Sequence, residues 1–540
     1  MYGTAPPPPP PLPLPARRRR VILIVILVLV VVVGVVVALV ARGGGKSKKH
    51  ANAPTGTIVV PVDGAKLQAN LERPSGNGPF PLVVMPGSWT AKADEYAQAV
   101  PKLVQRGFEV LAYAQRGVGG STGTVDFAGP QTQKDVSSVI DWALKNTPAD
   151  GKRVAAAGIS YGAAMSLLAA EQDPRIKTVV AMSGFTNFYE TLAPNGAGAR
   201  ETLVTLLGSR KVKDRLTHDP QQLLDDTLRG DGADAQALLK SMSPARSADR
   251  NVAALNRNHT AVMLANAYQD SVVPSADVLP FYEALTGPKR LQMAPGDHGS
   301  PEATALQGQQ NAVWDDAVAW LQRYAAGQQV DGARTGVFLT DSADGTAHQY
   351  ASVAAMASHT EQLYLDQRNG STLVNTAATG WTAQIKQGAA SLVDLPRVFA
   401  LVQPYQVPEV SSMLLSIAPA KKWTSAASTT PLLVNGTPTL HATVRPASST
   451  LSFVAYLFDI APDSKAKLMT YAPINQAGTA GAPRDVTMQF QPISWTVPAG
   501  HRIALVIDGV DKRFFADGTG NATIDATNTP VVLSLPVASS

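Results

Sequence analysis

The pattern of apolar and polar positions changes once along the chain, near residue 330. Before that point, short wholly apolar runs such as PLVVMPG (81–87) and FEVLAYA (108–114) alternate with amphipathic stretches such as QTQKDVSSVIDWALKN (131–146). Apolar runs of this length are typical of strands buried on both faces, and an apolar spacing of three to four residues is typical of helices. Residues 57–330 are therefore predicted to form a mostly parallel, doubly wound α/β sheet with helices on both faces.

Two stretches of this region depart from simple alternation. The segment KADEYAQAVPKLVQRG (92–107) is predicted to be a helix, although Pro101 favours a bend or a late start. Residues of about 184–256 are polar and helical, and they include DPQQLLDDTLRG and DAQALLKSM. Because this segment interrupts the succession of strands, it is predicted to be a cap over a site.

From residue 331 to residue 540 helical periodicity largely fades. Apolar runs such as GVFLT, LSFVAYLFDI and RIALVIDG are separated by turns that contain Gly, Pro, Asn or Asp. Short strands with regular turn signals are typical of sandwiches and barrels. This region is therefore predicted to be an all-β jelly-roll sandwich.

The N-terminal segment is predicted to anchor the chain in a membrane. Residues 21–40 are twenty apolar residues without a charge, and as a helix they would span about 30 Å, the thickness of a bilayer's hydrocarbon core. We assign residues 21–41 to a single transmembrane helix, 1–20 to a disordered, proline-rich basic tail and 42–56 to a linker. The alternative, a cleaved signal peptide, would have a shorter apolar run and an A-x-A-like site. The four arginines at 17–20 favour a cytoplasmic N-terminus and an extracytoplasmic catalytic domain.

Charge and cysteine content narrow the function further. The net charge is +5, but residues 1–50 hold eight Lys and Arg and no acid, which leaves 38 basic against 41 acidic residues in the rest. The body of the protein is thus close to −3, and no nucleic-acid partner is expected. The sequence has no cysteine, which excludes disulfides, thiolate zinc sites and a cysteine nucleophile.

A serine stands between two glycines in GISYG (158–162), after a strand-like run and before an alanine-rich, helix-like one. A tight turn from strand to helix forces such a serine into a strained conformation with its hydroxyl exposed. A Cβ at Gly158 or Gly162 would collide with the neighbouring strand and helix, and the helix N-terminus directs free N–H groups at the site. Ser160 is therefore predicted to be a nucleophile. The alternative is a turn of small residues selected for packing.

A serine nucleophile needs a base and a carboxylate that orients the base. In this kind of fold the order along the chain is Ser, then Asp or Glu, then His. Asp270 ends a predicted strand, and His298 lies in a glycine-flanked loop after the following strand. We predict Asp270 and His298 as the partners of Ser160, and we interpret Asp297 as a loop-shaping residue. No cofactor or metal is expected.

The oxyanion of an acyl-transfer intermediate needs two hydrogen-bond donors. One is predicted to be the backbone N–H of Tyr161, the residue after the nucleophile. The other is predicted to come from the loop after the strand PLVVMPG, from Ser88 or Trp89.

These residues resemble the family of X-Pro dipeptidyl-peptidases and cocaine-esterase-like hydrolases over residues of about 57–540. The resemblance rests on GISYG, on QRGVGGS (115–121), on Asp270 and His298, on AGHRI (499–503) and on the order of domains. It implies an α/β-hydrolase core with a helical cap and a C-terminal jelly roll. It also implies a serine acyl-enzyme mechanism on esters or on peptides with proline next to the N-terminus.

One departure from the family pattern bears on activity. Family members typically carry a Pro-Tyr pair after the third strand, whose tyrosine helps bind the oxyanion, whereas this chain has Pro86-Gly87. A backbone N–H or the indole N–H of Trp89 would have to substitute, which makes esterase-like activity the expectation. We predict a membrane-anchored serine hydrolase of small acyl esters or short peptides. Two alternatives stay open, an acyltransferase to an envelope alcohol and a non-catalytic binding module.

Overall fold

The computed structural model describes residues 56–389, 407–416 and 419–539. The predicted tail, transmembrane helix and nearly all of the linker lie outside the described residues, so these assignments stay predictions. In the described part of the chain, no helix combines the length and the apolar character needed to cross a membrane.

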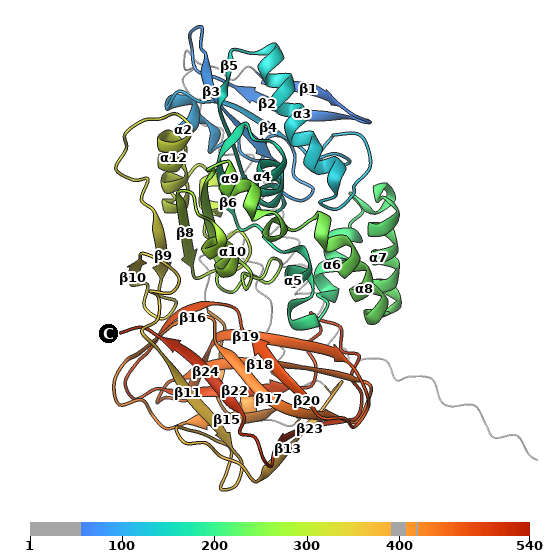
Figure 1. Ribbon diagram of the computed structural model, residues 1–540, viewed down its shortest axis with the longest axis vertical. Coiled ribbons are helices and arrows are strands. Elements are labelled where there is room, and N and C mark those ends of the chain that lie inside the picture. Colours follow the sequence, from blue (N-terminus) through green and yellow to red (C-terminus); the bar gives the residue numbers. More distant parts are fainter. Residues whose placement is uncertain (1–55, 390–406, 417–418, 540) are drawn as a thin grey trace, which may run out of the picture. The chain divides into compact units, whose positions relative to one another are not determined.

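The α/β region is built on a ten-stranded sheet with the order β1-β2-β4-β3-β5-β6-β7-β8-β9-β10 (Figure 1). From β4 to β9 the neighbouring strands run parallel, while β1, β2 and β10 pair antiparallel at the two edges. The carboxyl ends of β5, β7 and β8 therefore lie at one edge of the sheet, where open α/β sheets place their sites. The strands are β1 (Gly56–Val62), β2 (Ala65–Glu72), β3 (Phe80–Pro86), β4 (Glu109–Tyr113), β5 (Ala149–Ile159), β6 (Ile176–Met182), β7 (Ala261–Ala267), β8 (Lys289–Ala294), β9 (Gly336–Thr340) and β10 (Ala347–Tyr350).

Helices cover both faces of this sheet because its central strands are apolar on both sides. In β3, Leu82 and Val84 pack into one core with α3 and α4, whereas Val83 and Met85 pack into a second core with α2 and α12. The predicted doubly wound sheet is thereby confirmed. The helices around the sheet are α2 (Val100–Gln105), α3 (Pro130–Asn146), α4 (Tyr161–Gln172), α10 (Val278–Ala284), α11 (Ala303–Leu306) and α12 (Ala312–Tyr324).

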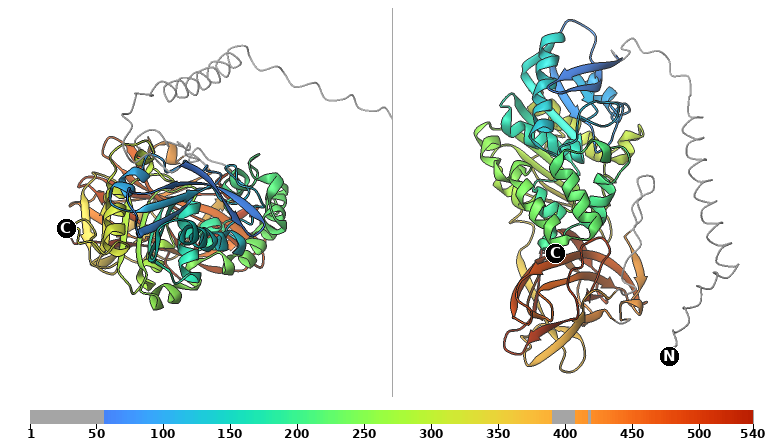
Figure 2. Two further views of the ribbon diagram at one scale, coloured as in Figure 1. Left: turned by 90° about the horizontal axis from the view of Figure 1, so that it is seen from above. Right: turned by 90° about the vertical axis from the view of Figure 1, so that its right-hand side faces the viewer.

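A helical insertion separates β6 from β7, in the segment where the sequence predicts a cap. Its first part, around α5, lies beside the strands of the C-terminal domain (Figure 1), and the backbone N–H of Phe515 donates to the carbonyl of Gly198 at 2.9 Å. Figure 2 shows the chain from two further sides. The side-chain amide of Asn195 likewise donates to the carbonyl of Gln489 at 2.9 Å. The insertion comprises α5 (Phe188–Leu192), α6 (Arg200–Leu207), α7 (His218–Arg229), α8 (Gly232–Met242) and α9 (Val252–Arg257), with short 3₁₀ turns at Pro194–Gly196, Lys213–Arg215, Ser243–Ala245 and Ala248–Arg250.

The C-terminal region is an all-β domain, as predicted, with fourteen strands among the described residues. Most neighbouring strands pair antiparallel, and the fully buried Trp423 and Trp495 belong to its core. The strands are β11 (His359–Asp366), β12 (Thr372–Val374), β13 (Trp381–Lys386), β14 (Glu409–Ser411), β15 (Lys421–Ser425), β16 (Leu432–Gly436), β17 (Thr439–Pro446), β18 (Thr450–Ile460), β19 (Lys465–Ala477), β20 (Arg484–Gln489), β21 (Ile493–Val497), β22 (Arg502–Asp508), β23 (Asn521–Ala526) and β24 (Val532–Val537), with a 3₁₀ turn at Leu414–Ser416.

The structure differs from the sequence expectations at two places. GVFLT, expected in the C-terminal sandwich, forms β9 of the first sheet, parallel to β8, and β10 extends that sheet to Tyr350. A short strand pairs with whichever sheet edge is open to it, and its own sequence does not identify that edge. The helix expected over 92–107 is α2, which begins only at Val100, because Pro101 is favoured in a first turn and disfavours helix before it.

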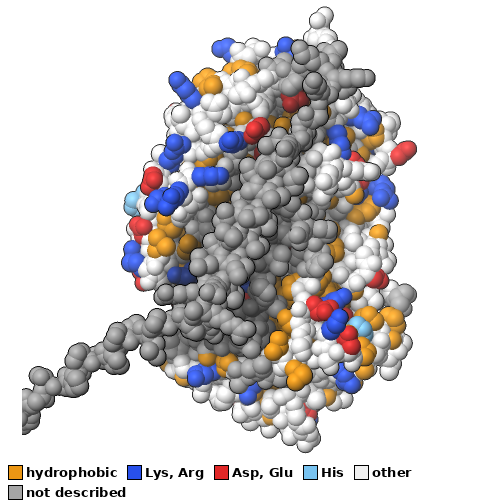
Figure 3. Space-filling view, turned by 180° about the vertical axis from the view of Figure 1, so that it is seen from behind, with side chains coloured by type: hydrophobic (Ala, Val, Ile, Leu, Met, Phe, Trp, Pro, Cys, Tyr) orange, Lys and Arg blue, Asp and Glu red, His pale blue; other side chains and the backbone are white. Residues whose placement is uncertain are grey.

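The described surface carries charges of both signs. On the face shown in Figure 3, basic and acidic side chains are interspersed over the residues that are coloured. The expectation of no nucleic-acid partner stays a prediction.

Candidate active site

Ser160 lies at the tight turn between β5 and α4. Its backbone has φ 57° and ψ −123°, a left-handed conformation that a residue with a side chain rarely adopts. Gly158 and Gly162 make the turn possible, since a Cβ at Gly158 would lie 2.6 Å from the carbonyl carbon of Gly162, and one at Gly162 would lie 2.1 Å from the carbonyl oxygen of Pro86. The close packing expected from the motif is thus present on both sides of the serine.

Two further loops bring His298 and Asp270 to this turn. His298 follows β8 and Asp270 follows β7, so both side chains come from carboxyl ends of strands. His298 Nε2 lies 2.7 Å from Ser160 Oγ, and His298 Nδ1 lies 2.8 Å from Asp270 Oδ2. Asp270 is fully buried, and its other oxygen accepts the backbone N–H groups of Val272 and Val273. The three residues form a continuous hydrogen-bonded chain.

Asp297, next to His298 in the sequence, lies outside this chain. Its Oδ1 accepts the backbone N–H and the hydroxyl of Ser271 and the backbone N–H of His298. It therefore ties the loop after β7 to the loop after β8, which fits its interpretation as a loop-shaping residue.

Several carboxyl groups act on the charge of His298. Burial opposes its protonation. The negative charges of Asp270, Glu302 and Asp297, together with the hydrogen bond that His298 donates to Asp270, outweigh burial, so the pKa of His298 is raised. Burial likewise raises the pKa of Asp270, although the nearby imidazole opposes this effect. The site is thus arranged to favour an imidazolium.

The predicted oxyanion donors need correction at two groups. The backbone N–H of Ser88 donates to Glu95 Oε2 at 2.8 Å, and the indole N–H of Trp89 donates to the carbonyl of Leu206 at 3.1 Å. Both donors already have acceptors, because the side chain of Glu95 folds back on the loop and α6 packs over the indole. The remaining candidates are backbone groups. The N–H of Tyr161 begins α4 and has no intrahelical acceptor, and the N–H of Trp89 has no acceptor among the described residues.

Three residues near the site have no sequence motif that would reveal them. The hydroxyl of the buried Tyr96 accepts the N–H of Ile159 and donates to the carbonyl of Pro86, at 3.1 Å each, which joins β3 to the end of β5. Glu95 lies on the active-site cavity, and burial raises the pKa of its carboxyl group. Glu302 is fully buried four residues after His298, and burial raises its pKa to about 7. An isolated acid or tyrosine has no spacing that distinguishes it from a surface residue.

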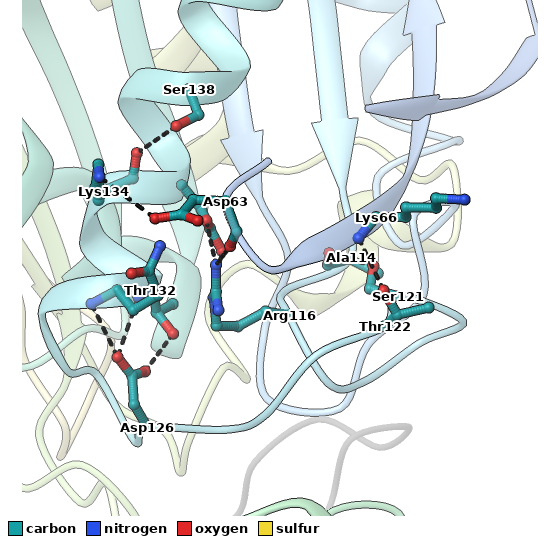
Figure 4. Close-up of polar contacts among 12 residues, drawn as sticks. Asp63, Lys66, Ala114, Arg116, Ser121, Thr122, Asp126, Thr132, Lys134 and Ser138 are labelled. Atoms are coloured by element: carbon teal, nitrogen blue, oxygen red, sulfur yellow. Dashed lines mark hydrogen bonds and ion pairs between the residues drawn. The ribbon is translucent and has the colours of Figure 1, made fainter. Parts of the chain in front are cut away.

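The segment QRGVGGS supports the site from a distance. Arg116 makes a two-point ion pair with the buried Asp135, at 2.6 and 2.7 Å, and also donates to the carbonyl of Asp63 (Figure 4). The side-chain amide of Gln115 donates to the carbonyl of Gly87, at the start of the loop after β3. Gly119 is required by space, because a Cβ there would lie 2.1 Å from the carbonyl oxygen of Ala91. The contacts of Gln115 and Gly119 position the loop that bears Ser88 and Trp89.

A cavity of about 350 Å³ opens at Ser160 and His298. Its walls come from the core, the cap and the loops after β7 and β8. Among the described residues, no group of three or more His, Asp or Glu side chains could hold a metal ion. The expectation that no cofactor is needed stays a prediction.

An α/β core with a histidine-bonded serine on a strained turn defines the class of serine hydrolases. The family model described as X-Pro dipeptidyl-peptidase (S15 family) matches residues 63–300, and that of the X-Pro dipeptidyl-peptidase C-terminal non-catalytic domain matches residues 339–532. The chain belongs to this X-Pro dipeptidyl-peptidase family. It is accordingly a serine hydrolase of ester or peptide bonds, and the predicted family is confirmed.

Solved structures share the whole described architecture. An alpha-amino acid ester hydrolase is similar with a TM-score of 0.68 and 18% identity, over 92% of this chain and 99% of its own. A CocE/NonD family hydrolase from Staphylococcus aureus is similar with a TM-score of 0.68 and 13% identity, over 89% of this chain and 93% of its own. At such identities the likeness shows the fold alone, and it confirms the predicted core and C-terminal β domain.

Curated relatives match a shorter part. An uncharacterized 31.7 kDa protein of Escherichia coli is 29% identical over 116 residues, and the thiohydrolase apmlB of Arthrinium phaeospermum is 32% identical over 123 residues. These matches cover 21% and 22% of this chain, and they span about two fifths of those relatives, 41% and 40% of their lengths.

Proposed function

We propose that Ser160, His298 and Asp270 form the catalytic triad of this hydrolase. The observation that carries the proposal is the hydrogen-bonded chain of 2.7 Å from Ser160 Oγ to His298 Nε2 and 2.8 Å from His298 Nδ1 to Asp270 Oδ2. His298 Nε2 takes the proton of the Ser160 hydroxyl as its oxygen attacks the acyl carbon. Asp270 accepts the Nδ1–H, holds the imidazole in the correct tautomer and stabilises the imidazolium.

The negative oxygen of the tetrahedral intermediate is bound by two backbone N–H groups, those of Tyr161 and Trp89. Both residues line the cavity next to Ser160, and preorganised donors of this kind stabilise charge that develops only in the transition state. His298 then returns its proton to the leaving group. A water molecule attacks the resulting acyl-Ser160 ester by the same route in reverse.

Pre-steady-state kinetics test this assignment. With an activated ester such as p-nitrophenyl butyrate, the wild-type enzyme should release a burst of p-nitrophenol equal to the enzyme concentration. If deacylation is too fast for a burst, quenching in acid should recover the labelled acyl group bound to the protein. Ser160→Ala should lose both signals while keeping its circular dichroism spectrum. Ser88→Ala, which removes the other serine hydroxyl of the cavity, should still form the acyl-enzyme. Acyl-enzyme formation by Ser160→Ala would refute the proposal.

We also propose that residues 21–41 anchor this hydrolase in a membrane as a single helix, with the catalytic domain on the extracytoplasmic side. The proposal is supported by the length and apolarity of residues 21–40 and by the arginines at 17–20. The full chain should stay in the membrane pellet after alkaline carbonate washing, and added protease should reach its catalytic domain in intact spheroplasts. A chain that begins at residue 51 should be recovered in the soluble fraction and remain active. Release of the full chain by carbonate would contradict the anchor.

A further inference from the structure

The cavity at Ser160 is walled almost entirely by apolar side chains. Six large apolar residues of this lining come from both the core and the cap: Trp89, Phe127, Phe185, Phe188, Leu192 and Leu206. Aromatic rings of this lining pack edge to face in a row. The ring centroids of Trp89 and Phe127 are 5.4 Å apart, those of Phe127 and Phe188 are 5.2 Å apart, and those of Phe188 and Phe185 are 5.9 Å apart. The volume of about 350 Å³ is near the lower end of the range for small-molecule sites, about 300–1,000 Å³.

This apolar wall begins at the residues that would hold the acyl carbon. Trp89 packs edge to face on the Tyr161 ring with centroids 5.0 Å apart, and these two residues carry the candidate oxyanion donors. With a carbonyl oxygen bound by their N–H groups, the acyl carbon lies next to the start of this wall. The wall therefore faces the acyl part of the substrate.

The lining offers little to a charged acyl group. Among the described lining residues, Glu95 carries the one carboxyl group and none is Lys or Arg. Glu95 Oε2 already accepts the N–H of Ser88 at 2.8 Å, and burial raises the pKa of this carboxyl group. A buried ammonium group is stable only with a well-placed counter-charge, and one oxygen of Glu95 already holds the loop that bears Ser88 and Trp89.

We propose that the cavity selects an uncharged, apolar acyl group and discriminates against substrates with a free α-ammonium group, including X-Pro peptides. This inference rests on the proposed function. In the reaction, the Ser160 oxygen forms a bond to the acyl carbon while the bond to the leaving alcohol breaks, and the serine proton passes through His298 to that alcohol. Water then displaces Ser160, which regains its proton, and the products are an uncharged-chain carboxylic acid and an alcohol.

A matched pair of esters tests the charge preference directly. The p-nitrophenyl esters of 4-methylpentanoic acid and of leucine share a carbon skeleton and differ by the α-ammonium group. After correction for their rates of hydrolysis by hydroxide, kcat/KM should favour the neutral ester by a factor on the order of 100. A preference for the leucine ester that disappears in Glu95→Gln would overturn the inference, because it would make Glu95 an ammonium receptor. Any preference for the leucine ester in the wild type would also overturn it.

A series of acyl chain lengths tests the apolar wall. For p-nitrophenyl esters from acetate upward, kcat/KM should rise about fourfold per methylene until the cavity is full, and then fall. With a fixed acyl group, lengthening the alcohol should change kcat/KM far less. A dependence on the alcohol instead of the acyl chain would contradict the proposal.

Two variants locate this preference in the cavity. Ala303→Phe and Thr205→Phe, which add a ring from the core side and from the cap side, should shift the optimum to shorter acyl chains. Thr205 is exposed, so its variant tests the proposal even if Ala303→Phe fails to fold. The control is Gln307→Phe, at an exposed position outside the lining, which should leave the optimum unchanged. An unshifted optimum in both lining variants would contradict the proposal. Activity that survives Ser160→Ala would instead refute the proposed function.

Discussion

The two domains each contain a histidine bonded to a buried aspartate, and the pairs are nearly identical in geometry. In the α/β core His298 Nδ1 lies 2.8 Å from Asp270, and in the β domain His501 Nδ1 lies 2.8 Å from Asp459. The imidazoles are 20% and 23% exposed, and the carboxylates 0% and 5%. Geometry within the pair therefore does not distinguish a site of chemistry from a structural contact.

The surroundings of the two pairs differ. His298 offers its second nitrogen to Ser160, on a strained turn beside an apolar cavity. No hydrogen bond joins the His501 side chain to a hydroxyl among the described residues, and the second oxygen of Asp459 accepts the indole N–H of Trp495 at 3.0 Å. We interpret the second pair as a structural contact that joins β18, β21 and the start of β22. A nucleophile and a cavity distinguish the first pair from the second.

Removing each imidazole should give the largest contrast. His298→Ala should lower kcat/KM by a factor on the order of 10⁵, because base and nucleophile act as one unit. His501→Ala should leave kcat/KM within about twofold, since His501 is not among the described residues that line the cavity. Steady-state kinetics on the same ester check both variants, and a comparable loss in His501→Ala would remove the distinction between the pairs.

Replacing each carboxylate by its amide should separate catalysis from stability. Asp270→Asn should lower kcat by about 10⁴-fold, because the amide favours the wrong imidazole tautomer. Asp459→Asn should leave kcat unchanged and lower the free energy of unfolding by about 1–3 kcal/mol, because Trp495 and His501 bond different oxygens of Asp459 and an amide keeps only one of these acceptors. Kinetics and urea denaturation of both variants measure the two effects. A kinetic defect in Asp459→Asn would contradict the comparison.

The pH dependence of activity should show how Glu302 acts on His298, the histidine of the catalytic pair. The base must be neutral, so activity should rise with pH through a value above about 6.5, the ordinary histidine pKa, because carboxylates raise the pKa of His298. Glu302 loses its proton only near pH 7, so Glu302→Gln removes a negative charge that is present in the upper part of this acid limb, and the limb should move to lower pH. A pH profile of kcat/KM checks this direction, and an unmoved limb would show that Glu302 does not act on His298.

The same variant makes a prediction about stability. Burial raises the pKa of Glu302 to about 7 from 4.5, so the folded protein retains a proton that the unfolded chain loses first. Glu302 does not lower the free energy of unfolding below about pH 4.5, where the carboxyl group is protonated in both the folded and the unfolded chain. As the pH rises toward 7, the free energy of unfolding falls by up to about 3 kcal/mol, because only the unfolded chain loses this proton readily. Glu302→Gln should therefore raise Tm at pH 8 and change it little at pH 4. A gain of equal size at both pH values would contradict this ionisation.

The smallest effect is expected at Asp297. Asp297→Asn keeps an oxygen that can accept from Ser271 and from the backbone N–H of His298, so kcat/KM should fall by less than about tenfold. The same assay measures it beside Asp270→Asn. A loss as large as that of Asp270→Asn would mean that the carboxylate is misassigned.

The sequence predicts the parts of the fold that are determined by residues close together in the chain. GISYG contains its own turn geometry, and the order of Ser160, Asp270 and His298 follows from the strands that end just before them. The alternation of apolar runs and helices likewise predicts the parallel sheet and the cap. These features depend on neighbours in the sequence.

Features that depend on distant neighbours could not be predicted in this way. The pairing of β9 with β8 depends on which sheet edge is free, and the indole of Trp89 is occupied because α6, more than 100 positions later, presents the carbonyl of Leu206. The raised pKa of Glu302 depends on complete burial, which a lone acid in a loop does not reveal. Tertiary contacts determine all three.

The position of a covalent adduct tests the central claim most directly. The protein is treated with a fluorophosphonate, digested and mapped by mass spectrometry, with Ser160→Ala and His298→Ala in parallel. We predict one phosphonylated residue, Ser160, in the wild type, no adduct in Ser160→Ala and strongly slowed labelling in His298→Ala. An adduct on another residue at wild-type rate, or undiminished labelling of His298→Ala, would contradict the account.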